Sequence, residues 1–232
     1  MKRIGIIGGL GPESTIDYYK GIINIFRQRE SGLAAPEIII YSADVNRLLE
    51  LAEAREWNKL VEWLVEMVNA LHNAGAEFAV IGSNTPHIVF DKVKSRSPIP
   101  MLSIVDETCK RASSMKLRKP GLIGTKFTME SDFFQKAFHD AGISVIVPMK
   151  DEQQFIHNKI ISEIALGIIK NSIRQELLSI AKRMIDEDSI DGLIIGCTEL
   201  PLILEKDEYG IPFLNTTAIH IASIVDYCIG KK

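Results

Sequence analysis

The chain has 232 residues, of which 46% are hydrophobic and 25% charged, a composition typical of a globular protein with a substantial core. Its formal net charge is −3, and no cluster of lysine or arginine offers an electrostatic footprint for nucleic acid. No apolar run is long enough to span a membrane, and the N-terminal MKRIGIIGG is too short and too rich in glycine for a signal peptide. We therefore expect a cytoplasmic protein that binds neither nucleic acid nor a membrane.

Short runs rich in isoleucine and valine alternate with longer amphipathic segments. In chain order the strand candidates are IGIIG (4–8), EIIIYS (37–42), FAVIG (78–82), PMLSIV (100–105), GLIG (121–124), ISVIVP (143–148), GLIIG (192–196) and PFLN (212–215). Residues 59–72 and 177–185 have helical periodicity and directly precede the third and the seventh of these strands. The alternation predicts an α/β fold whose parallel strands are joined by crossover helices.

Three landmarks of the first half recur in the second half in the same order. At offsets of 112 to 116 residues, the matching pairs are Gly8 and Gly124, Ser83 and Cys197, and Ile99 and Ile211. Three matches in register indicate a duplicated half. We expect two similar doubly wound parallel-sheet domains related by a pseudo-two-fold duplication, residues 1–98 with 210–232 and residues 99–209. The active site is then expected in the cleft between them.

The turn GGLGP, residues 8–12, follows the first strand and precedes a helix that Pro12 is suited to open. It lacks the last glycine of a dinucleotide fingerprint and the lysine of a phosphate loop. Two interpretations remain. The segment is either a plain strand-to-helix turn, or a turn whose backbone N–H groups bind a substrate carboxylate at the helix N-terminus. The second interpretation makes Leu10 and Gly11 candidate substrate-binding residues.

SNTPH (83–87) and CTEL (197–200) each place polar side chains directly after an apolar strand, at the edge where a doubly wound sheet binds ligands. A lone cysteine in such a place is commonly a small core residue. The duplication, however, would direct Ser83 and Cys197 to a common point. Two acid/base groups on opposite faces of one carbon are what inversion of a stereocentre by proton transfer requires.

The cysteines are three in number and form no CxxC pair, which argues against a disulfide framework and against a structural zinc site. We expect no metal. Cys109 and Cys228 fall in helical patterns with no neighbouring constellation of reactive side chains, and we interpret both as structural.

The segments IGIIGGLGPEST, SNTPH, GTKFTMES, GCTELPLIL and NTTAIH occur in order over essentially the whole chain. Together they resemble the aspartate/glutamate racemase family of cofactor-independent amino-acid racemases. The resemblance implies two similar α/β domains, no pyridoxal phosphate or other cofactor, a small amino-acid substrate, and commonly a homodimer. It also implies paired cysteines as acid and base. Ser83 departs from that pattern and places the chain nearest to a branch with a hydroxyl residue at this position.

The resemblance assigns proton transfer to Ser83 and Cys197, with Cys197 serving the L enantiomer. It implies substrate binding by residues in the matching motifs, namely Leu10, Gly11, Asn84, Thr85, Thr125, Thr128, Thr198 and Glu199. A lysine that some members carry before the glycine of ALGII is absent, since Ala165 and Leu166 stand there. Asn215 stands where the family often has aspartate. The expected substrate is aspartate or glutamate, and the recognition of its second carboxylate stays open.

Three further side chains have two interpretations each. Arg47, after the second strand, could pair with the substrate's side-chain carboxylate or be a solvated helix charge. His87 could assist Ser83 as a base or be a buried structural residue, and His220 has the same two interpretations.

A thiol and a hydroxyl are unequal partners in proton transfer. A thiolate is accessible at neutral pH when nearby donors lower the cysteine pKa from about 8.5, whereas a serine alkoxide is out of reach without a base. We therefore expect Cys197 to abstract the Cα proton of the L substrate and Ser83 to return a proton on the opposite face.

Two other functions remain open. One is a decarboxylase or isomerase of a small dicarboxylate that uses Cys197 alone, and the other is an amino-acid-binding protein without chemistry. The Asn84–Thr85 pair resembles the racemases rather than the decarboxylases. It is also open whether serine at position 83 is native or an engineered replacement of cysteine.

Overall fold

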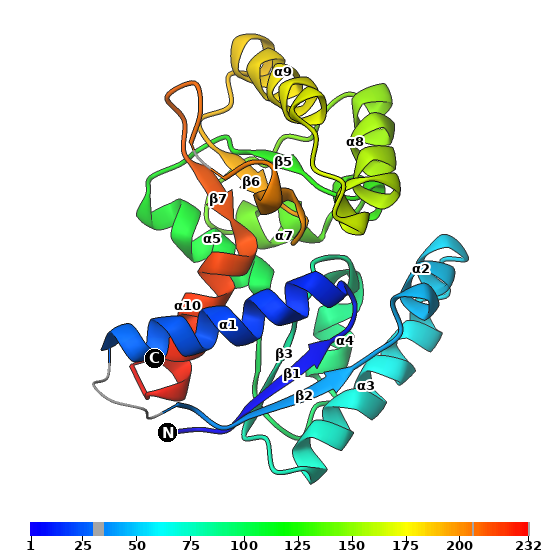
Figure 1. The fold of residues 1–232 in the computed structure, drawn as a ribbon, viewed down its shortest axis with the longest axis vertical. Helices are drawn as coiled ribbons and strands as arrows, with labels where there is room; N and C mark the ends of the chain where they lie inside the picture. Colours follow the sequence, from blue (N-terminus) through cyan, green and yellow to red (C-terminus); the bar gives the residue numbers. More distant parts are fainter. Residues whose placement is uncertain (30–34, 206, 232) are drawn as a thin grey trace. The chain divides into compact units, whose positions relative to one another are not determined.

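The structure, a computed structural model, describes residues 1–29, 35–205 and 207–231. The chain forms two compact units, Met1–Glu107 with Thr217–Lys232 (unit 1) and Thr108–Thr216 (unit 2). Each unit is a parallel β-sheet covered by helices (Figure 1). No helix within the described ranges is long and apolar enough to cross a membrane.

Unit 1 contains a four-stranded sheet in the order β2-β1-β3-β4, with every pair parallel. Its strands are β1 (Ile4–Gly8), β2 (Ile38–Ser42), β3 (Phe78–Ile81) and β4 (Met101–Leu102). Its helices are α1 (Pro12–Arg29), α2 (Val45–Glu53), α3 (Trp57–Asn73), the 3-10 helix η1 (Thr85–Val89), α4 (Phe90–Lys94), the first residues of α5 (Ile104–Ser114) and nearly all of α10 (Thr216–Cys228). The two central strands, β1 and β3, are buried along their whole length, which explains why their sequences are continuously apolar.

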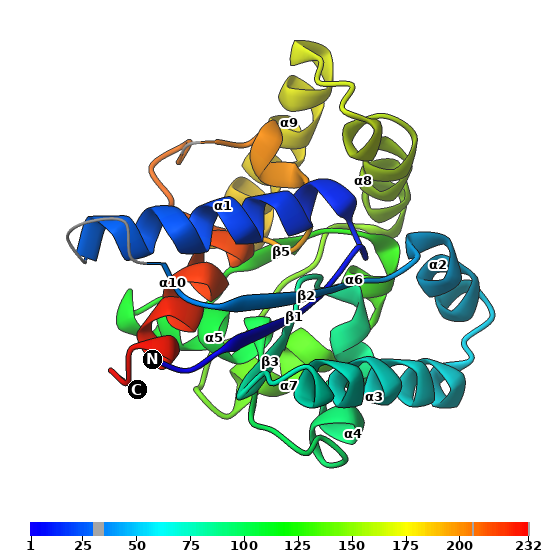
Figure 2. The same cartoon turned by 60° about the horizontal axis from the view of Figure 1, so that its bottom comes forward.

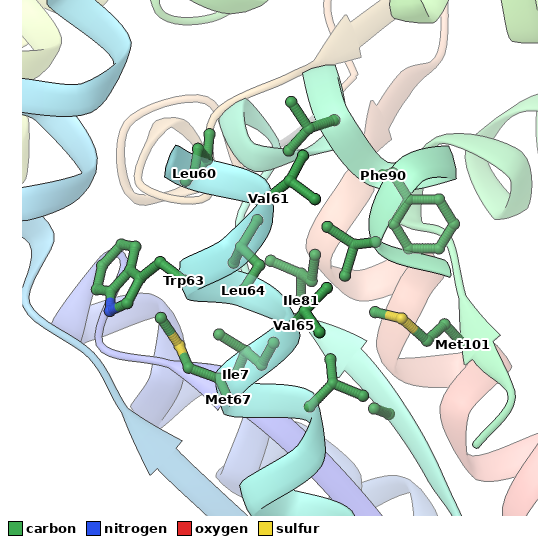
Figure 3. Packing of buried hydrophobic residues seen from close by; sticks show 14 of the residues in the cluster. Ile7, Leu60, Val61, Trp63, Leu64, Val65, Met67, Ile81, Phe90 and Met101 are labelled. Carbon is green, nitrogen blue, oxygen red and sulfur yellow. The ribbon is translucent and has the colours of Figure 1, made fainter. Parts of the chain in front are cut away.

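Helices cover both faces of this sheet. Alternate side chains of β1 and β3 point to opposite faces, as strand geometry requires. Ile4, Ile6 and Val80 pack with α1 and α10, whereas Ile7 and Ile81 pack with α3. Figure 3 shows this second cluster, which the apolar face of α3 dominates. The helix predicted for residues 59–72 is therefore confirmed as the core-facing part of α3.

Unit 2 repeats the arrangement with a three-stranded parallel sheet in the order β5-β6-β7. Its strands are β5 (Gly121–Ile123), β6 (Leu193–Ile195) and β7 (Phe213–Asn215). Its helices are α6 (Lys126–Glu130), α7 (Phe133–His139), α8 (Lys150–Ser162), the 3-10 helices η2 (Ile164–Leu166) and η3 (Leu200–Leu202), and α9 (Asn171–Asp188), together with the end of α5. Ile146 adds a single parallel bridge to the free side of β5, where β2 lies beside β1 in unit 1. The predicted ISVIVP strand is thus reduced to one bridge.

The duplication extends to individual hydrogen bonds. The Gly82 N–H donates to the Ile7 carbonyl at 2.9 Å, and the Gly196 N–H donates to the Ile123 carbonyl at 2.7 Å. In each unit this is the last hydrogen bond between the two strands, and it lies directly before Ser83 or Cys197. Two similar parallel-sheet domains are therefore confirmed, and these two residues occupy equivalent positions in them.

The chain passes from one unit to the other after residues 107 and 216, later than the boundaries that we placed after residues 98 and 209. Met101 pairs with Ala79, so β4 belongs to the sheet of unit 1, and Phe213 pairs with Leu193, so β7 belongs to that of unit 2. The chain enters unit 2 within α5 and returns to unit 1 at the start of α10. A sequence pattern shows that a strand exists but not which sheet it joins, and this accounts for the difference.

Candidate active site

In unit 1, three candidate segments lie at the carboxyl-terminal edge of the sheet. Gly8 at the end of β1 pairs with Ser42 at the end of β2, and Ile7 pairs with Ile81 at the end of β3. Neighbouring strands are about 4.8 Å apart. The GGLGP turn, the segment leading to Arg47 and the segment starting at Ser83 therefore begin side by side, at the edge where open α/β sheets bind ligands.

The GGLGP turn is fixed by Thr15. The Gly9 N–H donates to Thr15 Oγ1 at 2.8 Å, and the Thr15 N–H donates to the Gly11 carbonyl at 3.1 Å. Gly9 has a φ of +76°, and a Cβ at this position would lie 2.2 Å from the Ala43 carbonyl oxygen, so only glycine fits. Within the described residues the Leu10 and Gly11 N–H groups have no acceptor. Their predicted role as carboxylate ligands is compatible with this geometry and stays a prediction.

Ser83 is buried, and its backbone is held by neighbours. The Ser14 hydroxyl donates to the Gly82 carbonyl at 2.8 Å, directly before Ser83. The Ser83 hydroxyl itself makes no hydrogen bond to any residue that the structure describes. Asn84 and Thr85 follow it and are also buried. The site therefore combines a fixed main chain with a hydroxyl that can turn toward a ligand.

Both ring nitrogens of His87 make hydrogen bonds to the backbone. Its Nε2 lies 3.3 Å from the Ile104 N–H, which can only donate, and its Nδ1 lies 2.9 Å from the Ser83 carbonyl oxygen. Nδ1 must then carry the proton and donate to Ser83. Burial lowers the pKa of His87 to about 4, against the opposing effect of backbone hydrogen bonds to Ser83 and Asn84. The ring is neutral with no free lone pair for the Ser83 hydroxyl, which favours the structural interpretation.

In unit 2, Cys197 follows β6 and shares a carboxylate with its neighbour. The Cys197 thiol donates to Glu199 Oε2 at 3.0 Å, and the Thr198 hydroxyl donates to the same oxygen at 2.8 Å. Burial and the negative Glu199 carboxylate raise the pKa of the Cys197 thiol well above its usual value. The backbone N–H groups of Glu199 and Leu200 oppose this effect without reversing it. In this arrangement the nearby donors therefore do not lower the thiol pKa below its usual value.

Thr125 and Thr128 lie at the end of β5, beside β6. The Thr125 side chain caps α6 by accepting from the Thr128 N–H at 3.4 Å, and the two hydroxyl oxygens are 3.2 Å apart. A Cβ on Gly124 would lie 2.9 Å from the Gly196 carbonyl oxygen, so these two strand ends approach closely. Both threonines thus share a sheet edge with Cys197, and their substrate-binding role stays a prediction.

The remaining candidates, His220, Cys109 and Cys228, each have a hydrogen-bond partner within their own unit. His220 is buried, and its Nδ1 lies 2.7 Å from the Tyr18 hydroxyl. The thiols of Cys109 and Cys228 donate to the backbone carbonyls of Ala137 and Lys2. These contacts favour a structural interpretation for all three.

Leu166, which stands where some relatives have lysine, is 69% exposed on η2. The described part of the chain holds no group of three or more metal-ligating side chains.

Arg47 lies in the first turn of α2, with its guanidinium Cζ 4.7 Å from the centroid of the Trp63 ring. The sequence did not single out Trp63, whose only signal was its place one helical turn after Leu60 on α3. Ser14 and Thr15, which fix the ends of β3 and β1, were also missed.

A sequence model of the family described as Asp/Glu/Hydantoin racemase matches residues 7–224. The chain belongs to this family. The broad-specificity amino-acid racemase RacX of Bacillus subtilis is 25% identical over 227 residues, which cover 96% of each chain. An aspartate racemase homologue from Pyrococcus horikoshii has a solved structure that is 35% identical, covers 99% of this chain and 100% of its own, and superposes with a TM-score of 0.84. The aspartate racemase of Picrophilus torridus, at 20% identity and a TM-score of 0.79, shares the fold.

The family resemblance predicted from the motifs is thereby confirmed, and the protein is an amino-acid racemase.

Proposed function

We propose that this racemase acts on aspartate or glutamate, without pyridoxal phosphate, by moving protons at both faces of the α carbon. One observation carries the proposal: Ser83 and Cys197 occupy equivalent positions, each directly after a glycine whose N–H closes the strand ladder. A duplicated fold that supplies one acid/base group from each copy suits a reaction that must treat two mirror-image faces alike.

Acidic substrates are supported by the chain's relatives and by one cation. Several relatives are named aspartate or glutamate racemases. In unit 1, Arg47 has no hydrogen bond or ion pair to any described residue, and a guanidinium binds a carboxylate with two parallel hydrogen bonds. We assign the substrate's side-chain carboxylate to Arg47 and its α-carboxylate to the Leu10 and Gly11 N–H groups, with Asn84, Thr85, Thr125 and Thr128 completing the contacts.

Glu199 is proposed to bind the substrate ammonium group. The carboxylate is one of the causes that keep the Cys197 thiol protonated. A positive ammonium on Glu199 neutralises that charge and adds a cation close to the sulfur, so the thiol pKa falls when the substrate is bound. The thiol then loses its proton to water, and the thiolate forms only where a substrate is present.

In the proposed reaction, the Cys197 thiolate removes the α proton of the L substrate, so that the Cα–H bond breaks and an S–H bond forms. The Ser83 O–H bond breaks as its proton passes to the opposite face of Cα, and water then restores the hydroxyl. Because the enantiomers have equal free energy, kcat/KM must be the same in both directions. The unequal chemistry of serine and cysteine is therefore visible only as compensating differences in kcat and KM.

The test is proton NMR of L-aspartate and L-glutamate incubated with the protein in D2O, combined with chiral analysis of the same samples. We expect loss of the Cα proton signal together with the D enantiomer. Ser83→Ala should retain exchange on the L face and lose inversion, and Cys197→Ala should lose both. Cys109→Ala, a change at another buried cysteine, is the matched control and should retain both.

Two results would contradict the proposal. Exchange of the L substrate by Cys197→Ala would refute the role of the thiol. Failure of the unaltered protein to exchange either acid would refute the substrate class.

A further inference from the structure

Arg47 occupies a place that helix stability does not favour. It is the third residue of α2, whose N-cap is Asp44, and the Asp44 side chain accepts from the Asn46 N–H at 2.9 Å. The first turn of a helix carries a partial positive charge, which stabilises acidic side chains and disfavours cations. The contacts of the Arg47 side chain therefore explain its position better than any stabilisation of α2 does.

The Arg47 side chain contacts the face of the Trp63 ring. The Cζ atom lies 4.7 Å from the ring centroid, within the range of a cation–π contact. Trp63 is only 6% exposed and belongs to the cluster that packs α3 on the sheet, beside Met67 (Figure 3). A side chain fixed in a core gives the guanidinium a rigid surface on which to lie.

The contact with the ring face restrains the guanidinium without using its donors. None of its N–H groups has an acceptor among the residues that the structure describes. Two other arginines of unit 1 differ in this respect, since Arg96 pairs with Glu62 and Arg29 pairs with Asp226. Arg47 therefore combines a restrained guanidinium with free donors, and such a group can bind a carboxylate with two hydrogen bonds.

The location matches that of the candidate site. α2 follows β2 at the end of the strand where the GGLGP turn also lies (Figure 2). Gly9 approaches Ala43 so closely that no Cβ fits between them, and Arg47 follows four residues later. The segment that carries Arg47 thus starts at the edge of the sheet where the segments of Leu10, Gly11 and Ser83 also start.

We infer that Trp63 is a positioning residue: it holds Arg47 in the orientation that binds the side-chain carboxylate of an acidic substrate, and so helps to determine specificity. The inference rests on the proposed function, because it concerns the same substrate. It predicts that loss of the indole weakens binding of acidic substrates and leaves the proton-transfer step unchanged.

The variants are Trp63→Leu, which removes the aromatic face, Trp63→Phe, which keeps one, and Trp57→Leu, which alters the other tryptophan of α3. For L-glutamate exchange in D2O, Trp63→Leu should raise KM about tenfold with little change in kcat. Trp63→Phe should recover most of that loss, and Trp57→Leu should leave KM unchanged. In an Arg47→Leu background, Trp63→Leu should have no further effect on KM, because the two side chains act as one unit.

Succinate binding, measured by calorimetry, provides a readout that does not require turnover. Equal KM values for the unaltered protein and Trp63→Leu, or additive effects of the Trp63 and Arg47 changes, would overturn the inference and leave the proposed function standing. Succinate binding that depends on Trp63 without exchange of either amino acid would support the inference and refute the proposed function. Absence of both exchange and succinate binding would refute the two together.

Discussion

At the scale of single residues, the chemistry of Cys197 depends on the side chain two positions further on. Glu199 accepts from the thiol and from the Thr198 hydroxyl through one oxygen, so the carboxylate adds to the effect of burial on the thiol pKa. A cysteine whose thiolate forms only next to a bound cation is protected from oxidation and alkylation in the absence of substrate.

Replacing Glu199 by glutamine should lower the pKa of the Cys197 thiol, because the negative charge is removed while a hydrogen-bonding side chain of similar size remains. The pH dependence of Cys197 alkylation by iodoacetamide, followed by mass spectrometry of its peptide, measures this change. The same variant should lose at least about tenfold in kcat/KM if Glu199 binds the substrate ammonium. An alkylation profile identical to that of the unaltered protein would show that the carboxylate does not control the thiol.

His87 should make the free energy of unfolding depend on pH. Its pKa is about 4 in the folded protein, below the value of 6.5 for an unperturbed histidine. Above pH 6.5 both states are neutral and His87 contributes no pH dependence. As the pH falls from 6.5 towards 4, only the unfolded state binds the proton, so the folded state loses up to about 3 kcal/mol.

Urea unfolding of the unaltered protein and of His87→Gln at pH 7 and pH 4.5 measures this loss. The variant should show a smaller decrease between the two pH values, whatever its stability at pH 7. His72→Gln, which changes an exposed histidine of α3, should retain the full decrease. Equal decreases in all three proteins would contradict the assignment of a neutral, buried His87.

At the scale of elements, the strand ends are positioned by close backbone approaches that only glycine permits. Gly9 lies against Ala43, and Gly124 lies against the Gly196 carbonyl. These contacts bring the turn after β1 against the segment after β2, and the end of β5 against the end of β6. Each set of candidate side chains is therefore placed by main-chain packing as much as by the sheet itself.

Gly9→Ala should destabilise the protein by more than about 2 kcal/mol, because it combines an unfavourable positive φ with a clash against backbone atoms. Gly210→Ala is the matched control: Gly210 has the same φ of +76°, and nothing lies within 4 Å of the added Cβ. The control should cost only about 1 kcal/mol. Urea unfolding measures both, and equal losses would show that the approach to Ala43 is not a constraint.

At the scale of the whole molecule, the fold is a duplication whose last helix returns to the first unit. α10 follows β7 of unit 2, yet Ile221, Ile224 and Val225 pack with α1 and the sheet of unit 1. The C-terminal helix therefore completes the core on which the Ser83 strand rests. The prediction that the C-terminal segment crosses back to the first half anticipated this return, although the strand before it stays with unit 2.

Much of the molecule follows from the sequence alone. Alternating apolar runs and amphipathic segments predicted parallel α/β architecture, because a strand buried on both faces must be continuously apolar. The recurrence of glycine and a polar residue after matched strands predicted the duplication, and it singled out Ser83 and Cys197. These features are local, and local patterns survive in a linear sequence.

Only the tertiary structure decided which sheet each strand joins, which tautomer His87 adopts, how Glu199 acts on the Cys197 thiol, and what surface Arg47 meets. Each of these depends on groups brought together by packing, or on burial that changes the relative energies of charged and neutral forms. The pairing of Arg47 with Trp63 joins two helices, and the partners of His87 lie in segments after two different strands. The sequence determined which residue types were available for chemistry, and the fold determined their protonation, orientation and partners.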